Sequence, residues 1–222
     1  MPSIEKEAYF TPEKLTFQAR EMLRSPGLIA HKAAPAFDPA RAALLVLDMQ
    51  CYFLDEASHA YIPSVSAILP GVRQLAAGFY ARSLPVIFTR HTNLPQDAGL
   101  MGSWWRDLIG PDEQRSQITP QLDLTQGILM EKHHYDAFYD TSLEEHLHGL
   151  GVRQVVITGV MTHLCCETTA RSAFMRGFLP VFLVDGTATY NHYFHLATLT
   201  NLAHGFASLA LVADILAALE GG

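Results

Sequence analysis

The chain has 222 residues, of which 49% are hydrophobic and 17% are charged. This length suits one α/β domain with a large core, and the apolar content excludes an intrinsically disordered chain. The formal net charge is −7, and no stripe of Lys and Arg is present, which argues against a nucleic-acid partner. The apolar runs are too short to cross a bilayer, and the first residues do not resemble a signal peptide. We therefore expect a cytoplasmic protein that does not bind membranes.

Residues 11–24 predict an amphipathic helix, because Thr11, Pro12 and Glu13 supply a cap, a first-turn proline and an early acidic residue. A loop through Pro35 and Pro39 follows. Further helices are expected at residues 72–82, 142–150, 165–176, 192–205 and 214–219. Strands are expected at residues 42–47, 84–89, 127–131, 153–159, 179–184 and 207–212. A long irregular stretch, residues 90–125, carries both tryptophans.

Strands that alternate with helices predict an α/β fold with a mostly parallel sheet and helices on both faces. In such sheets, ligands bind beyond the carboxyl ends of the strands. The residues that decide function should therefore lie directly after the strands. These are Asp48, Arg90, His91, Lys132, the turn at residues 162–165, and Asp185.

Three of these residues form a chemically coherent set. Cys165 opens a predicted helix, whose first amides and dipole would stabilise a thiolate. Asp48 could accept the thiol proton, and Lys132 could hold both partners charged. Taken singly, each has a simpler explanation: a cysteine that fills a core, an aspartate in a turn, and a surface lysine.

The cysteine content favours a reducing compartment. There are three cysteines, an odd number, and two of them, Cys165 and Cys166, are adjacent in sequence. Adjacent cysteines rarely pair with each other, and Cys51 alone gives no disulfide framework. Cys166 is one helical step of about 100° beyond Cys165 and should face the core.

Three motifs resemble those of a known family. Leu-Leu-Val-Leu-Asp-Met-Gln-Cys-Tyr-Phe at residues 44–53 resembles the opening strand of the isochorismatase-like cysteine hydrolases. Lys-His-His-Tyr-Asp-Ala-Phe at residues 132–138 resembles the lysine motif of that family. Gly-Val-Met-Thr-His-Leu-Cys-Cys-Glu-Thr-Thr-Ala-Arg at residues 159–171 is similar to its nucleophile motif. The likeness begins near Phe37, so residues 1–36 form an N-terminal helical extension and residues 37–222 form the hydrolase domain.

The resemblance implies a three-layer αβα, Rossmann-like fold with a six-stranded parallel sheet. It also implies a catalytic triad of Asp48, Lys132 and Cys165, and a cis peptide between Val160 and Met161. The backbone amides of Met161 and Cys165 would then form an oxyanion hole. Family members assemble as dimers or tetramers, so a homo-oligomer is expected.

Departures from the family patterns narrow the chemistry. The nicotinamidases carry an Asp-x-His metal cluster after the second strand, whereas this chain reads Thr-Arg-His-Thr-Asn at residues 89–93. We therefore expect no metal and no other cofactor. Enzymes that cleave the vinyl ether of isochorismate carry glycine at the position of Cys165, so the cysteine argues against that activity. His163 stands where the amidases often have asparagine.

The sequence also predicts which residues form the walls of the binding site. Aromatic residues in a long loop suggest a lid over a small planar or apolar substrate. Trp104 and Trp105 could equally pack in a dimer interface. The residues in or beside the motif loops, which we predict to bind substrate, are Gln50, Phe53, His91, Trp104, Trp105, Tyr135, Phe138 and Thr162.

The sequence therefore predicts a cysteine hydrolase that cleaves a small amide, ureide or carbamoyl compound through a thioester. The alternative is a vinyl-ether hydrolase in which Asp48 is the general acid and Cys165 takes no part. Two alternatives without catalysis are a thiol redox sensor and an inactive binding module.

Overall fold

A computed structural model of the chain describes residues 4–25, 28 and 35–221. One sheet of six strands, all paired in parallel, has the order β3-β2-β1-β4-β5-β6. The strands are β1 (Ala42–Leu47), β2 (Val86–His91), β3 (Ile128–Lys132), β4 (Gln154–Val160), β5 (Leu179–Ala188) and β6 (Ser208–Ala210). Strands β1 and β4 lie at the centre and are buried along their whole length, as expected of strands covered on both faces.

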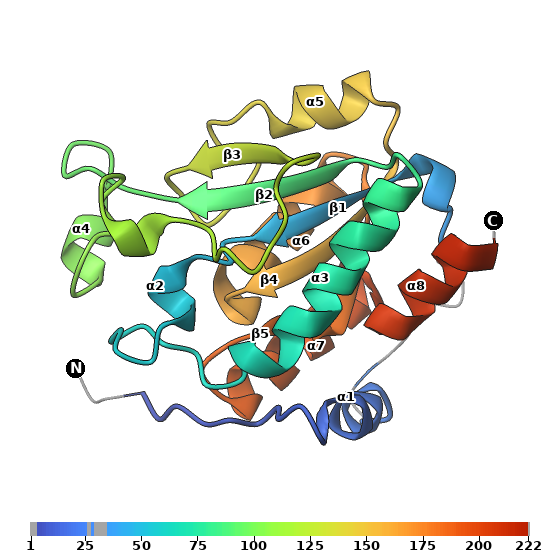
Figure 1. The fold of residues 1–222 in the computed structure, drawn as a ribbon, viewed down its shortest axis with the longest axis horizontal. Coiled ribbons are helices and arrows are strands. Elements are labelled where there is room, and N and C mark those ends of the chain that lie inside the picture. Colours follow the sequence, from blue (N-terminus) through green and yellow to red (C-terminus); the bar gives the residue numbers. More distant parts are fainter. Residues whose placement is uncertain (1–3, 26–27, 29–34, 222) are drawn as a thin grey trace.

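Helices cover both faces of the sheet. The helices are α1 (Leu15–Leu23), α2 (Cys51–Leu54), α3 (Val65–Ala81), α4 (Met101–Trp104), α5 (Leu143–Gly149), α6 (Glu167–Met175), α7 (His192–Gly205) and α8 (Val212–Gly221). In Figure 1, α3 and α8 lie in front of the sheet and α6 lies behind it. Right-handed crossovers place α5 and α7 on the face of α6. The predicted three-layer α/β fold is confirmed.

Shorter helical turns complete the chain. They are η1 (Pro39–Arg41), η2 (Gln114–Ser116) and the π-helical turn η3 (Thr162–Cys166). The predicted helix at residues 165–176 therefore begins as η3, and the regular helix α6 starts only at Glu167. Cys165 lies inside this wider turn, directly after β4.

The helix predicted at residues 72–82 is longer than expected, because α3 begins at Val65 and contains Pro70. A proline inside a helix removes one backbone hydrogen bond and favours a break. Here the first turns of α3 bury Val65, Ile68 and Leu69 in the core. Packing of this apolar face outweighs the local preference of Pro70.

The prediction that Asp185 follows a strand end is wrong. Strand β5 continues to Ala188, so Asp185 lies within it. Its Oδ1 accepts a hydrogen bond of 2.8 Å from the backbone N–H of Val212, the first residue of α8. Asp185 therefore caps a helix on one face of the sheet and does not belong to the site at the strand ends.

The N-terminal segment packs on the same core as the rest of the chain. Tyr9 and Phe10 belong to the main hydrophobic cluster. The Tyr9 hydroxyl accepts a hydrogen bond of 3.0 Å from the backbone of Thr189 and lies 3.0 Å from Nδ1 of His195. The boundary near residue 36 stays a prediction.

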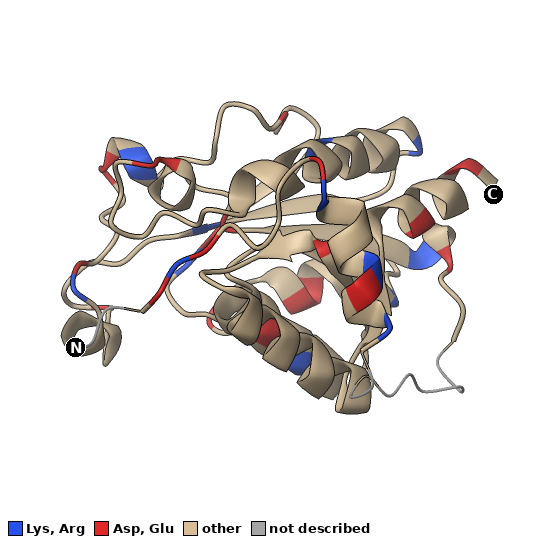
Figure 2. Cartoon of the chain, turned by 90° about the horizontal axis from the view of Figure 1, so that it is seen from below, with Lys and Arg blue, Asp and Glu red and all other residues tan. Residues whose placement is uncertain are grey.

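Charges of both signs are interspersed over the outer helices and loops (Figure 2). Within the described residues, no helix is both long and apolar enough to span a membrane.

Candidate active site

The sheet brings together three residues that are far apart in sequence. Asp48 follows β1, Lys132 ends β3, and Cys165 lies in η3 after β4. The Nζ atom of Lys132 lies 2.8 Å from Oδ2 of Asp48 and 3.4 Å from Sγ of Cys165. The side chains of Asp48 and Lys132 are 0% exposed, and Cys165 is 7% exposed. The three side chains therefore form one buried cluster at the carboxyl edge of the sheet.

Thr89, on the neighbouring strand β2, fixes the Asp48 carboxylate. Its hydroxyl donates a hydrogen bond of 2.6 Å to Oδ1 of Asp48, while the backbone N–H of Asp48 donates to the Thr89 carbonyl at 3.2 Å. The backbone of Asp48 has a φ of 51°, a left-handed conformation that aspartate tolerates better than most residues. These contacts fix Oδ1 of Asp48, so that Oδ2 faces the ammonium group of Lys132.

Close contact between the central strands requires a glycine beside the site. Gly159 on β4 pairs with Leu47 on β1, directly before Asp48. A Cβ atom at position 159 would lie 2.1 Å from the Leu47 carbonyl oxygen, and the φ of 112° also favours glycine. This glycine therefore sets how closely the strands that carry Asp48 and the Cys165 turn approach each other.

Lys132 is held as a cation. Burial alone would lower its pKa, but the Asp48 charge and Cys165 outweigh that effect and raise the pKa above its usual value. Its ammonium group also donates a hydrogen bond of 2.9 Å to the carbonyl of His134. The three N–H donors thus have a carboxylate, a sulfur and a carbonyl within reach.

The surroundings of Cys165 favour the protonated thiol over the thiolate. Burial raises its pKa, and the Asp48 carboxylate raises it further, while Lys132 offsets only part of this increase. The sequence analysis expects Asp48 to accept the thiol proton, and that role stays a prediction.

The adjacent cysteines face different surroundings. Cys166 is fully buried in the main hydrophobic cluster, whereas Cys165 lines a cavity. The peptide bond between Val160 and Met161 is cis, and Met161 lines the same cavity as Cys165. The oxyanion hole formed by the amides of Met161 and Cys165 stays a prediction.

A cavity of about 510 Å³ opens onto Cys165, within the size range of small-molecule sites. Of the residues predicted to bind substrate, those that line this cavity are Phe53, His91, Trp104, Trp105 and Tyr135. The indole N–H of Trp105 donates a hydrogen bond of 2.7 Å to the hydroxyl of Tyr135. This contact connects the loop that carries Trp105 to the segment that follows Lys132.

The other three predicted binding residues lie elsewhere. Gln50 is fully buried, and its side-chain amide hydrogen-bonds the backbone N–H and carbonyl of His91, each at 2.9 Å. Phe138 stacks on Phe178. Thr162 is fully buried, with its hydroxyl 3.1 Å from Nδ1 of His195. These side chains support the loops around the cavity and do not line it.

Three histidines around the site have lowered pKa values, which favour the neutral imidazole. Burial, together with the Lys132 charge, lowers the pKa of His91 to about 4. Burial lowers the pKa of His163 to about 4 and that of His195 to about 3. His163 stacks on Phe194, with Nδ1 2.6 Å from the Thr189 hydroxyl. His163 therefore connects η3, the turn that also carries Cys165, to α7.

Several residues that line the cavity were not predicted from the sequence to bind substrate. Lys6 and Tyr190 come from segments without a family motif, and Arg106 and Asp107 lie in the long irregular loop. Nothing in the local sequence marks them, because the path of the chain alone brings them to the cavity. Among the residues with described positions, no group of three or more His, Cys, Asp or Glu side chains could hold a metal ion.

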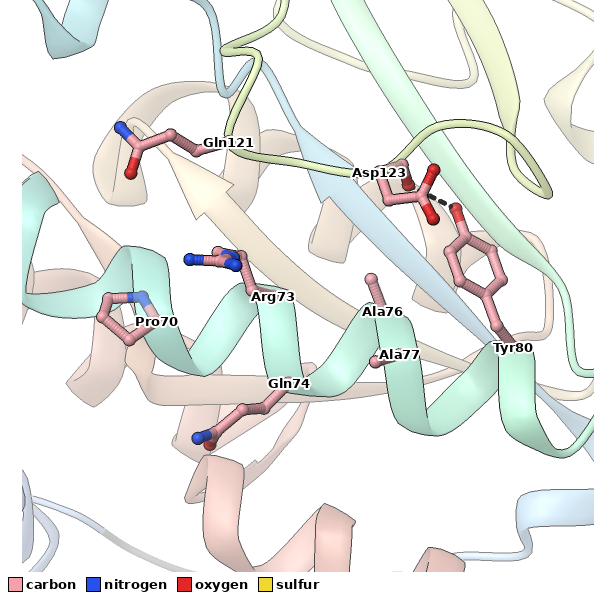
Figure 3. A pocket seen from close by; sticks show the side chains of 8 residues that line it. All are labelled: Pro70, Arg73, Gln74, Ala76, Ala77, Tyr80, Gln121 and Asp123. Atoms are coloured by element: carbon pink, nitrogen blue, oxygen red, sulfur yellow. Dashed lines mark hydrogen bonds between the residues drawn. The ribbon is translucent and has the colours of Figure 1, made fainter.

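A second hollow, of about 470 Å³, lies along α3. Figure 3 shows Arg73, Gln121 and Asp123 around it, and the Tyr80 hydroxyl donating a hydrogen bond of 2.8 Å to the Asp123 carbonyl. Its lining contains no nucleophile or buried charge pair. Of the two hollows described, only the first is lined by a cysteine that contacts a buried ion pair.

Comparison with known proteins agrees with this geometry. Residues 42–214 match the isochorismatase domain, a span that includes Asp48, Lys132 and Cys165. The chain belongs to the isochorismatase family. It is an isochorismatase-like hydrolase.

Two named relatives and one solved structure are similar to this chain over most of its length. Nicotinamidase 3 of Arabidopsis thaliana is 42% identical over 173 residues, which cover 76% of this chain and 83% of that protein. Enterobactin synthase component B of Escherichia coli (strain K12) is 30% identical over 207 residues, covering 90% of this chain and 71% of that protein. A solved cysteine hydrolase from Pseudomonas syringae pv. phaseolicola 1448A has a TM-score of 0.82 at 22% identity, over 86% of this chain and 99% of that chain. This last similarity shows the shared fold.

Proposed function

We propose that the protein is a cysteine amidohydrolase that cleaves a carbon–nitrogen bond of a small amide, ureide or carbamoyl compound through a thioester. One observation carries the proposal: the buried Asp48–Lys132 ion pair contacts Cys165 at the wall of a cavity. A buried charge pair is costly to desolvate and is weak evidence for stability. Its position beside a nucleophile favours a catalytic role.

Asp48 is the base of the first step. It takes the Cys165 proton as the sulfur attacks the substrate carbonyl, which forms a carbon–sulfur bond and places negative charge on the carbonyl oxygen. The amides of Met161 and Cys165 would stabilise that oxygen, with about 3–4 kcal/mol for each donor. Lys132 balances the charge of whichever partner is ionised.

The same carboxyl group serves the later steps. When the tetrahedral species collapses, the carbon–nitrogen bond breaks and Asp48 returns the proton to the leaving ammonia or amine. The carboxylate then takes a proton from water, and the resulting hydroxide attacks the thioester. The carbon–sulfur bond breaks, the acid product leaves, and Cys165 regains a proton. Atoms and charge balance over the cycle.

The test is release of ammonia or amine from a panel of small amides and ureides by the wild type, Cys165→Ala and Cys166→Ala. We expect turnover in the wild type and in Cys166→Ala and none in Cys165→Ala. An acid-quenched reaction should show an acyl adduct on the peptide that contains Cys165. Equal turnover by wild type and Cys165→Ala would overturn the proposal.

The presence of an isochorismatase, from Bacillus subtilis (strain 168), among the relatives keeps vinyl-ether cleavage as a second candidate. In that reaction Asp48 would protonate the substrate, and Cys165 would not be needed. Isochorismate supplied to the wild type and Cys165→Ala separates the two chemistries. Pyruvate release that survives Cys165→Ala, without ammonia release from any amide, would establish the second candidate.

A cytoplasmic homo-oligomer, dimer or tetramer, remains part of the proposal, supported by the family. Light scattering of the purified protein would give its subunit number.

A further inference from the structure

The N-terminal segment forms part of the wall of the Cys165 cavity. Ile4 and Lys6 line it together with Tyr190. The backbone N–H of Glu7 donates to the carbonyl of Tyr190 at 2.8 Å. In Figure 1 this segment passes on the side of the molecule where the strand arrowheads and α2 lie. Residues outside the family motifs are thus positioned to meet a bound substrate.

The ammonium group of Lys6 is fixed in place although its side chain is long. It donates hydrogen bonds to the backbone carbonyls of His59, at 2.6 Å, and Tyr61, at 2.9 Å. It also lies 4.2 Å from the centroid of the Tyr190 ring, a cation–π contact. Two of its three N–H donors are used, so one remains to bind a ligand. The entropy cost of ordering the side chain is already met in the free protein.

Lys6 differs from the other charged residues of the cavity because it lacks an anionic partner. Asp107 lies 3.6 Å from Nε of Arg106 and 3.4 Å from Nδ1 of His59. No acidic side chain among the described residues forms an ion pair with Lys6. Its ammonium group contacts two neutral carbonyls and an aromatic ring. Partial burial also lowers its pKa. A negatively charged group at this point would stabilise the ammonium ion.

We propose that Lys6 binds a carboxylate of the substrate at a distance from the scissile carbonyl. The substrate class would then be small amides or ureides that carry an anionic carboxylate, with their apolar portion against the aromatic wall. Lys6 would be a specificity-determining residue supplied by the N-terminal segment. This inference rests on the proposed cysteine amidohydrolase function.

The test compares each anionic amide with a neutral isostere. Three ω-carboxylated primary amides, with one, two and three methylene groups between the carboxylate and the amide, are paired with analogues that have isopropyl in place of the carboxylate. Nicotinamide serves as a neutral aromatic amide. Ammonia release gives kcat and KM for the wild type, Lys6→Met, Lys6→Arg and the exposed control Lys14→Met.

We expect the wild type to favour at least one anionic amide over its isostere by tenfold or more in kcat/KM. Lys6→Met should reduce this ratio at least tenfold, mainly through KM, whereas Lys6→Arg and Lys14→Met should retain most of it. An unchanged ratio in Lys6→Met would overturn the inference. A wild type that prefers nicotinamide or the neutral isosteres would also overturn it.

A binding measurement separates this inference from the proposed function. Calorimetry with Cys165→Ala measures binding of the same anionic amides without turnover. Binding that requires Lys6, together with no Cys165-dependent ammonia release, would overturn the hydrolytic proposal and retain the anion site. Neither binding nor turnover with any anionic amide would overturn the anion site. Turnover that does not depend on Lys6 would overturn the anion site alone.

Discussion

Neutralising Asp48, the proposed catalytic base, should make Cys165, the proposed nucleophile, easier to alkylate. In the resting site, burial and the Asp48 carboxylate raise the pKa of the Cys165 thiol, while Lys132 opposes them. Asp48→Asn keeps the size of the side chain and an oxygen for the Thr89 hydroxyl, but it removes the negative charge. The positive charge of Lys132 would then act on the sulfur alone and would favour its thiolate form. We expect Asp48→Asn to abolish turnover and yet to increase the thiolate fraction.

The size of this effect follows from the Lys132–Cys165 distance. At 3.4 Å, a full positive and a full negative charge attract by about 5 kcal/mol at an effective dielectric constant of 20. In the wild type, the carboxylate 2.8 Å from the same ammonium offsets much of this attraction. If one third of it becomes available in Asp48→Asn, about 1.7 kcal/mol, the thiolate fraction at neutral pH rises by more than about tenfold.

The assay is iodoacetamide labelling at pH 7, followed by peptide mass spectrometry that resolves Cys51 from the two adjacent cysteines. The rate at Cys165 should increase at least tenfold in Asp48→Asn, and its dependence on pH should move to lower values. Asp123→Asn, which neutralises an exposed loop carboxylate along α3, is the control and should label like the wild type. Slower or unchanged labelling in Asp48→Asn would refute the assigned electrostatics.

Other predictions concern stability and orientation. Lys132→Met and Asp48→Asn should each cost about 3–5 kcal/mol in free energy of unfolding by urea, because each leaves one buried charge unpaired; the double variant should cost less than their sum, and strict additivity would contradict the ion pair. Thr89→Val should lower kcat/KM about tenfold or more by releasing Asp48, since a hydrogen bond to a charged group contributes about 1.5–3 kcal/mol; unchanged kinetics would contradict this role. The three histidines described above titrate near pH 6.5 when unfolded and at about 4 or below in the folded protein, so the unfolded chain binds more protons between pH 6.5 and 4. Stability should therefore fall as the pH is lowered through this range, by up to about 1.4 kcal/mol per pH unit for each histidine. A flat urea-unfolding profile over that range would contradict their buried neutral state.

The regular elements could be predicted where local signals agree with packing. The strand at residues 42–47 and the helix at residues 192–205 have the predicted bounds, matching β1 and α7. The first is a continuous apolar run, and the second begins after Asn191, whose side chain accepts a hydrogen bond of 3.0 Å from the backbone of Phe194. In both cases one short segment contains the information that determines the element.

The predictions from the sequence are wrong or incomplete where contacts between distant residues outweigh a local signal. Pro70 suggested a break, but burial of the residues before it extends α3 to Val65. The apolar run at residues 179–184 predicts a strand that ends before Asp185, but β5 continues to Ala188 and Asp185 caps α8. The position of Lys6 at the cavity depends on hydrogen bonds to carbonyls 53 and 55 residues away. No window of the sequence contains both partners of such a contact.

The raised pKa of Cys165 has a consequence for how the site works between turnovers. Alkylating agents and oxidants react with thiolates, so a thiol kept protonated in an apolar wall is protected while the cavity is empty. In the proposed mechanism the proton moves to Asp48 as the carbon–sulfur bond forms, when the new negative charge lies on the substrate oxygen instead of on sulfur. A site that combined Lys132 and Cys165 without Asp48 would hold more thiolate but would lack the group that protonates the leaving amine. In the proposed mechanism the carboxylate would therefore suppress the thiolate of the resting site and enable the complete cycle, and for this reason labelling and turnover should respond to Asp48→Asn in opposite directions.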